Sequence, residues 1–195
     1  MNRIRLRNSR TRFQSAVLSL IALSVLLVAS GCKLSSEQIE FQRAEKAAEK
    51  NDYDKALKHY LAVVERYVNT PLAVRAAEES ARIFHYVKKQ PKDAVQYYKH
   101  VVLYAPETRE RIEAQKKLAE IHLTELMDYN QAIAEYSRLL ELERTPDEEF
   151  TYRLAIARSY FYLSNFYQAQ VETEKILSGN YEKDQLFDAL LLKAN

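Results

Sequence analysis

The stretch DYDKALKHYLAVV at residues 52–64 decides the fold, because three later stretches repeat its pattern. These are QPKDAVQYYKHVV (90–102), DYNQAIAEYSRLL (128–140) and NFYQAQVETEKIL (165–177). Their central alanines, Ala56, Ala94, Ala132 and Ala169, follow one another at spacings of 38, 38 and 37 residues. A fixed period of this length is typical of a stacked repeat array.

Each repeat carries one apolar helical face. Four residues after the central alanines lie Tyr60, Tyr98, Tyr136 and Thr173, and aliphatic residues follow seven and eight positions on. These positions share one face of a helix. A second alanine precedes each central one by twelve or thirteen residues, at Ala44, Ala81, Ala119 and Ala157. Two small residues on consecutive helices permit close packing, so each unit is predicted to be a helical hairpin and the chain a solenoid.

Prolines and caps set the predicted helix boundaries. Pro71, Pro91, Pro106 and Pro146 each fit the first turn of a helix, where a missing N–H costs nothing. Thr145 and Glu148 have the spacing of a capping box. We predict helices over residues 36–50, 53–68, 71–88, 91–104, 107–126, 129–143, 147–163, 166–178 and 182–193. No stretch has the period of a strand, so the expected fold is all-α, with four hairpins and a closing helix.

Composition excludes several classes of function. The 195-residue chain has a formal charge of +2, but residues 1–31 hold five arginines and no acidic group, which leaves 24 basic against 27 acidic residues. This balance argues against a basic nucleic-acid binder. The two glycines, Gly31 and Gly179, cannot form a glycine-rich phosphate loop, and one cysteine excludes an internal disulfide. His122 with Glu125 is a lone i, i+3 pair, interpreted as a surface contact. We expect no enzymatic activity, no metal site and no cofactor.

The N-terminus has the organisation of an export signal. Residues 1–12 are arginine-rich, residues 16–29 are almost wholly apolar, and Ala29-Ser30-Gly31 precede Cys32. This order is typical of a secretory signal peptide, and the apolar run is shorter than the roughly 20 residues of a membrane span. The ending A-S-G-C resembles a bacterial lipobox, which implies that residues 1–31 are removed and Cys32 is acylated. A plain signal peptide or a signal anchor is the alternative. The predicted parts are therefore 1–31 (signal), 32–36 (lipidated cysteine and tether) and 37–195 (solenoid).

The alanine, aromatic and proline spacing over residues 37–195 resembles the tetratricopeptide repeat, whose fold is a right-handed helical solenoid. The departures are a period nearer 38 than 34, the absence of tryptophan, and Pro91 in place of the usual aromatic residue.

Within that class, DYDKALKHYLAVVERYVNTPLAVRAA (52–77) resembles the long repeats of BamD-type outer-membrane lipoproteins and of the periplasmic cell-division coordinator CpoB. BamD-type proteins are lipid-anchored solenoids in the machine that inserts β-barrels, and CpoB-like proteins lack a lipobox. Pilotins of type IV pilus secretins are also lipid-anchored repeat proteins, and the motifs do not separate these groups. An enzyme-accessory or peptidoglycan-associated role is a third alternative. The resemblance implies envelope protein partners, and Lys33 after the cysteine favours the outer membrane, with the solenoid facing the periplasm.

In tetratricopeptide repeats the first helix of each unit lines the concave surface. Residue-by-residue matching places the following side chains there: Phe41, Glu45, Arg75, Glu78, Arg82, His85, Glu113, Lys116, Glu120, Thr151, Leu154, Arg158 and Phe161. The resemblance implies a groove of mixed charge for an extended peptide or a protein tail. A solvated surface without a ligand is the alternative.

The predicted last helix, 182–193, is rich in leucine. Leu186, Phe187, Leu190 and Leu191 share one face, and Leu192 lies on the other. Because an array end needs a polar cap, we expect this helix to dock a partner or a second copy through Leu192. A cap buried against the preceding hairpin is the alternative.

Overall fold

The computed structural model describes residues 35–142, 144–179 and 181. Contacts divide the chain into two units, Met1–Ser36 and Glu37–Asn195. The helices are α2 (Ser36–Ala48), α3 (Tyr53–Tyr67), α4 (Pro71–Arg82), α5 (Pro91–Tyr104), α6 (Thr108–Thr124), α7 (Tyr129–Leu140), α8 (Pro146–Tyr162) and α9 (Phe166–Leu177), with a π-helical turn η1 (Ile83–Val87) after α4. The predicted Cys32, Leu192 and closing helix 182–193 lie outside the described residues.

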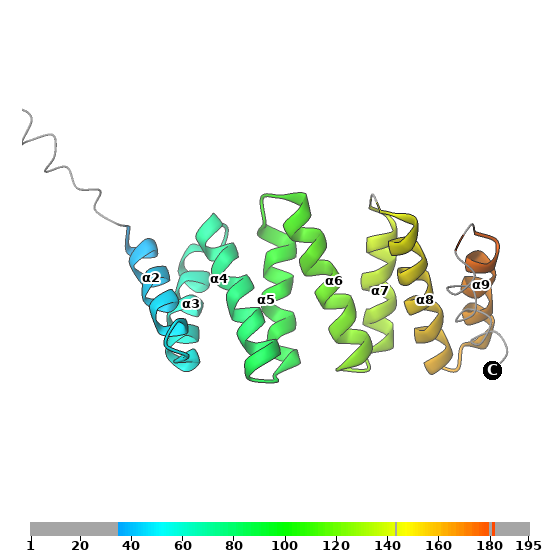
Figure 1. The fold of residues 1–195 in the computed structure, drawn as a ribbon, viewed down its shortest axis with the longest axis horizontal. Coiled ribbons are helices and arrows are strands. Elements are labelled where there is room, and N and C mark those ends of the chain that lie inside the picture. The colour runs from blue at the N-terminus through cyan, green and yellow to red at the C-terminus, as the bar shows by residue number, and fades with distance from the viewer. Residues whose placement is uncertain (1–34, 143, 180, 182–195) are drawn as a thin grey trace, which may run out of the picture. The chain divides into compact units, whose positions relative to one another are not determined.

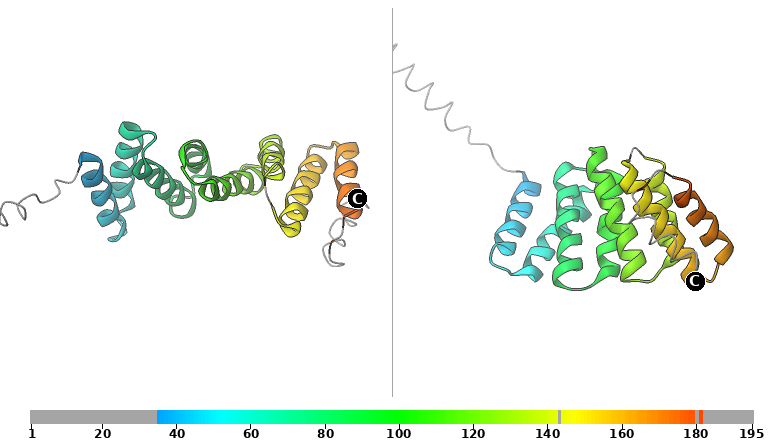
Figure 2. Two further views of the ribbon diagram at one scale, coloured as in Figure 1. Left: turned by 90° about the horizontal axis from the view of Figure 1, so that it is seen from above. Right: turned by 45° about the vertical axis from the view of Figure 1, so that its right-hand side comes forward.

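The helices follow one another in chain order as antiparallel hairpins (Figure 1). From α3 to α9 each helix packs against the next one along the chain, and two further views show the same order (Figure 2). The edge-to-face contact of Phe41 and Tyr60, with ring centroids 5.4 Å apart, joins α2 to α3. Four consecutive hairpins form an all-α array, so the predicted tetratricopeptide-like solenoid class is confirmed.

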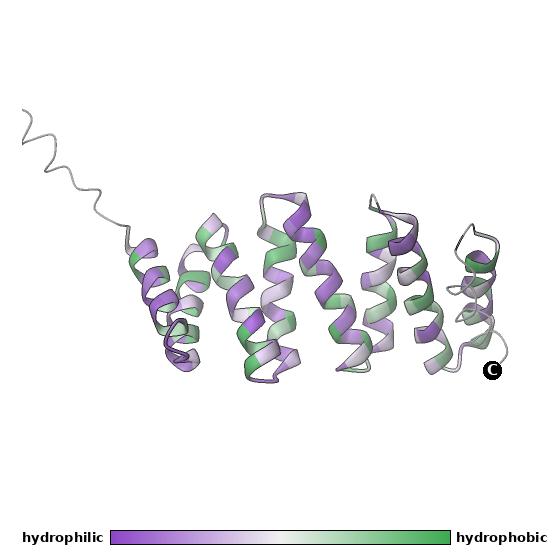
Figure 3. Ribbon diagram, viewed as in Figure 1, coloured by the Kyte–Doolittle hydropathy of each residue, from purple (hydrophilic) through white to green (hydrophobic). Residues whose placement is uncertain are grey.

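The repeated small residues form the interior of every hairpin. Seven of the eight repeated alanines are 0 % exposed, and Ala169 is 5 % exposed. Tyr60, Tyr98, Tyr136 and Thr173, four residues after the central alanines, are also buried. Hydrophobic and hydrophilic residues therefore alternate around the helices, with a largely hydrophilic front on α6 (Figure 3). Helix periodicity, rather than the β propensity of valine and tyrosine, sets the structure.

The two alanines of a pair are twelve residues apart in two units and thirteen apart in the other two. The extra residue is accommodated at the end of the first helix. In each unit, the backbone N–H of the residue that caps the second helix donates to a carbonyl near the end of the first helix. The acceptor lies five residues before the donor for Asp52 and Asn165, and six residues before it for Gln90 and Asp128. The longer reach occurs in the two units whose paired alanines are thirteen residues apart. In the second unit the extra residue is taken up by η1, since a π turn inserts one residue into a helix. The helix predicted over 71–88 is therefore α4 followed by η1.

Each hairpin turn holds one residue in the left-handed backbone region. These residues are Asn51, Lys89, Met127 and Ser164, with φ between 52° and 58°. Glycine favours this conformation, yet none of the four is glycine. They recur at the same spacings as the central alanines, so all four hairpins share one turn geometry.

The predicted caps are largely confirmed. Pro71, Pro91 and Pro146 begin α4, α5 and α8, and Thr145 and Glu148 form a capping box. The prediction for Pro106 is wrong, because α6 begins two residues later, at Thr108. The proline holds Ala105 in extended backbone (φ −61°, ψ 131°), and Glu107 is extended too, so helical geometry starts only after them.

Candidate functional site: the first-helix face

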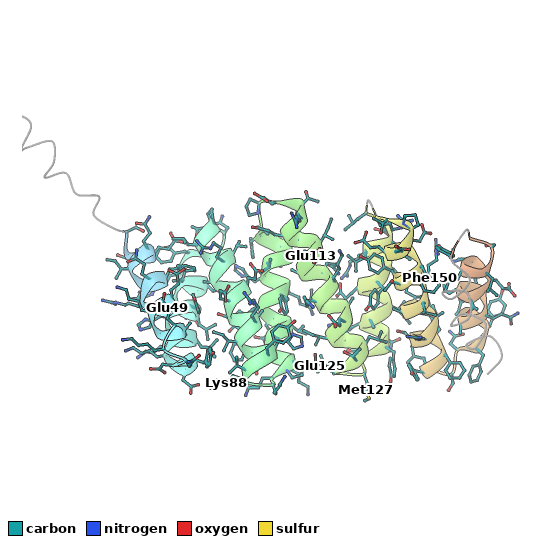
Figure 4. The ribbon with its side chains drawn as sticks, viewed as in Figure 1. Glu49, Lys88, Glu113, Glu125, Met127 and Phe150 are labelled. Atoms are coloured by element: carbon teal, nitrogen blue, oxygen red, sulfur yellow. The ribbon has the colours of Figure 1, made fainter. Side chains whose placement is uncertain are left out.

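The first helix of each unit contributes side chains to one surface, which we call the first-helix face. These first helices are α2, α4 with η1, α6 and α8. Arg75 Nη2 lies 3.6 Å from Glu45 Oε1 and joins α2 to α4. Lys116 Nζ lies 2.8 Å from Glu148 Oε1 and joins α6 to α8. His85 on η1 contacts the Glu125 carboxylate at the end of α6. Figure 4 labels Glu125 close to Met127, which lies in the turn after α6. Contacts to a glutamate carboxylate therefore connect each first helix to the next.

A pocket of about 240 Å³ opens between α4 and α6 on this face. Its lining is Glu78, Arg82, Tyr86, Tyr98, Val101, Glu110, Glu113, Ala114 and Lys117. Sequence matching had placed Glu78, Arg82 and Glu113 on one surface, and the pocket brings these three together. Tyr86, Tyr98, Glu110 and Lys117 were not predicted. Tyr98 occupies an ordinary core position in the sequence, and η1, which carries Tyr86, has no sequence signal.

Three predicted groove residues belong to the core instead. Phe41 is 4 % exposed, and His85 and Leu154 are each 6 % exposed. Phe41 packs on Tyr60, and the Arg75 guanidinium covers the ring at 4.8 Å from its centroid. A first helix must bury one stripe to hold its hairpin together, and these positions lie on that stripe. Their prediction as groove surface is corrected accordingly.

The fourth unit presents its predicted residues differently. Thr151 and Arg158 on α8 are exposed, whereas Phe161 is half-buried. Phe161 joins an aromatic cluster across the α8–α9 turn, with its ring centroid 5.5 Å from that of Phe166. In this cluster Tyr162 and Phe166 are more than half exposed, as is the adjacent Tyr167 at 73 %. Phe161, predicted to line the groove, is therefore part of a larger exposed aromatic surface at the α8–α9 turn.

A polar cluster that the sequence did not predict lies between α6 and α7. Glu135 is only 2 % exposed, accepts a hydrogen bond from Gln115 Nε2, and lies 2.5 Å from Arg138 Nη1. His122 is 5 % exposed, so its interpretation as a surface contact is wrong. Burial lowers the pKa of His122, which favours the neutral imidazole.

The Lys116–Glu148 contact shifts both pKa values. The hydrogen bond from Lys116 lowers the pKa of Glu148 to about 2, and the Thr145 backbone N–H adds to the effect through the capping box. The same contact raises the pKa of Lys116. Because the folded pKa of Glu148 is lowered, its stabilising contribution is complete above its ordinary value of 4.5 and is lost as the pH falls toward 2.

We predict that Glu148 titrates well below 4.5 in the folded protein, and that its pKa rises toward 4.5 in Lys116→Ala, because the main donor to the carboxylate is then missing. Carboxyl carbon NMR shifts followed against pH measure this directly. Lys117→Ala removes a neighbouring ammonium that pairs with Glu120 instead, and should leave Glu148 unchanged. Titration of Glu148 near 4.5 in the unmodified protein would contradict the prediction.

Within residues 35–142, 144–179 and 181, no group of three or more histidine, cysteine or acidic side chains is arranged to hold a metal ion. Among the same residues, no helix has both the length and the apolar character to cross a membrane.

Comparisons of this chain with known proteins give matches among solved structures alone. No protein-family model and no curated protein matches it. Among solved structures, the crystal structure of MamA protein is similar, with 16 % sequence identity, a TM-score of 0.33, and coverage of 72 % of this chain and 90 % of that one. The fold class rests on the hairpins themselves: an all-helical repeat array of the tetratricopeptide type, a class of fold that presents extended protein-binding surfaces.

Proposed function

We propose that this protein is a lipid-anchored, non-enzymatic scaffold that binds partner proteins in a bacterial envelope through its first-helix face. The observation that carries the proposal is the pocket between α4 and α6, which joins charged side chains from two consecutive units around a buried tyrosine. Arrays of stacked hairpins bind extended segments along such faces.

The sequence supports a location for this scaffold. The A-S-G-C ending at residues 29–32 favours acylation of Cys32, and Lys33 favours the outer membrane over retention at the inner one. A lipidated cysteine would hold the array at the inner face of that membrane, in the periplasm. Several acyl chains on one residue give firm anchoring, since each buried CH₂ contributes about 0.8 kcal/mol.

Among envelope roles, BamD-like duty in outer-membrane protein assembly leads, because residues 52–77 combine the D-Y-x-x-A pattern with a lipobox upstream. A pilotin-type role in secretin assembly, or another envelope complex, is the alternative, since it shares the lipid anchor and the repeats. The predicted C-terminal contact at Leu192 adds self-association as a further mode of assembly.

The experiment is crosslinked affinity capture of the full-length, lipidated protein from envelope membranes. Glu110→Lys changes the pocket, and Glu65→Lys makes the same exchange on the exposed side of α3 as a matched control. Capture of the barrel-insertion machine supports the leading role, and capture of a secretin supports the alternative. We expect Glu110→Lys alone to lose the partner. Equal capture by both variants would contradict the first-helix face as the binding surface, and substrate turnover without a stable partner would contradict the scaffold.

The anchor gives a separate prediction. Cys32→Ala should abolish lipidation and block maturation, because no other cysteine exists in the chain. Mass spectrometry of the mature unmodified protein should show acylated Cys32 as its first residue. Ser35→Ala, three residues away, should mature normally. A mature chain that begins elsewhere and carries no lipid would contradict the prediction.

A further inference from the structure

The charges around the α4–α6 pocket do not balance. Its lining holds three carboxylates, Glu78, Glu110 and Glu113, and two cations, Arg82 and Lys117. Among the lining groups, acidic charge is therefore in excess by one.

The two cations are already engaged. Arg82 Nη1 lies 3.2 Å from Glu79 Oε1, and Lys117 Nζ lies 3.0 Å from Glu120 Oε2. Of the three carboxylates, Glu113 lies 3.0 Å from Lys116 Nζ. Within the part of the chain that the structure describes, Glu78 and Glu110 have no cation at ion-pair distance. Two carboxylates on facing helices thus form no ion pair with another described residue.

The electrostatics of Glu78 agree with this imbalance. Burial raises the pKa of Glu78, and the neighbouring Glu79 and Glu110 carboxylates raise it further, while Arg82 and Arg75 lower it in part. A cation placed in the pocket would relieve that repulsion.

The floor of the pocket supplies an independent observation. Tyr98 is 4 % exposed and lines the pocket, and its hydroxyl makes no side-chain hydrogen bond to another described residue. A group entering the pocket can therefore form a hydrogen bond with this hydroxyl. Its oxygen, like the carboxylates of Glu78 and Glu110 that line the same pocket, can accept from a cationic N–H donor.

We propose that this pocket receives one lysine or arginine side chain from an extended segment of the partner protein. The inference rests on the proposed function, because it specifies the chemistry of the partner at the same face. A volume of about 240 Å³ accommodates a single long side chain. The Tyr86 ring, Val101 and Ala114 provide apolar contact for its methylene groups, while Glu78, Glu110 and Tyr98 accept from its charged end. An acidic side chain would instead meet three carboxylates.

The test uses the full-length protein in detergent micelles and three capped peptides, Gly-Ser-X-Ser-Gly, in which X is arginine, lysine or glutamate. Binding is followed by the methyl NMR signals of Val101 and Ala114, which line the pocket. We expect the arginine and lysine peptides to shift both signals and the glutamate peptide to shift neither. The double variant Glu78→Gln/Glu110→Gln should weaken arginine-peptide binding by about tenfold or more, because charge-assisted acceptors are replaced by neutral amides.

Controls separate the pocket from general electrostatics and from folding. Glu65→Gln removes a carboxylate on α3 and should leave peptide binding unchanged. Tyr98→Phe removes only the hydroxyl and should weaken binding several-fold without unfolding the array, as checked by circular dichroism. Equal shifts with the glutamate peptide, or unchanged arginine binding in the double variant, would overturn the inference.

The outcome also separates this inference from the function on which it rests. If the double glutamine variant still captures the envelope partner as the unmodified protein does, the pocket inference is wrong while the scaffold stands. If the unmodified protein binds the basic peptides but captures no partner, the pocket inference holds and the scaffold proposal fails.

Discussion

Replacing Leu139 with alanine is expected to lower the free energy of unfolding by about 2–5 kcal/mol, the cost of a cavity in a packed core. Leu139 on α7 is 1 % exposed and packs in the cluster that joins α6, α7 and α8. Each unit of a repeat array contacts only its neighbours, so loss of this contact weakens two interfaces at once. Urea unfolding followed by circular dichroism at 222 nm measures the change.

Leu103→Ala is the matched control, since it makes the same chemical change at a side chain that is 71 % exposed. Its expected cost is below about 0.5 kcal/mol. Equal unfolding midpoints for the two variants would show that Leu139 is not part of a packed interior.

The second large effect is overpacking between paired helices. Ala132→Leu and Ala94→Leu should each cost about 1–3 kcal/mol, because the added methylene groups have no space at a close helix contact. Both alanines are 0 % exposed. Thermal unfolding monitored by circular dichroism gives the comparison.

Lys92→Leu, on the exposed surface of α5, is the control for introducing leucine and should cost under about 0.5 kcal/mol. If all three leucine variants melt with the unmodified protein, the assignment of Ala94 and Ala132 to close contacts fails.

Much of the fold was predictable because its signals are local. The paired alanines, the tyrosine four residues on and the capping box of Thr145 and Glu148 each depend on helical geometry within a few turns. The helices of the described array accordingly begin and end within a few residues of their predicted limits.

The remaining features depend on contacts between units or on backbone states without a residue signature. Lys89 and Met127 adopt left-handed backbone without being glycine, and η1 changes the hydrogen-bond pattern of a stretch that reads as an ordinary helix. Pro106 precedes its helix rather than beginning it, because the extended backbone at Glu107 intervenes.

The candidate site was predictable in outline and not in detail. Matching to the repeat placed Glu78, Arg82 and Glu113 on one surface, and these residues do share a pocket. The same matching did not predict that Phe41 and His85 are buried. On one helix, the residues that face the groove and the residues that face the core occupy adjacent positions, so the repeat pattern alone does not separate them. Tyr98 lines that pocket from a core position, which only the packing of α5 between α4 and α6 reveals.

The central claim is that the first-helix face holds a partner protein. Site-specific photo-crosslinking in living cells tests it most directly, with the photoreactive residue placed at Glu110 in the pocket or at Glu65 on the exposed side of α3. The account predicts one discrete crosslinked envelope protein from position 110 and none from position 65. Crosslinks from position 65 alone, or from neither position in correctly anchored protein, would contradict it.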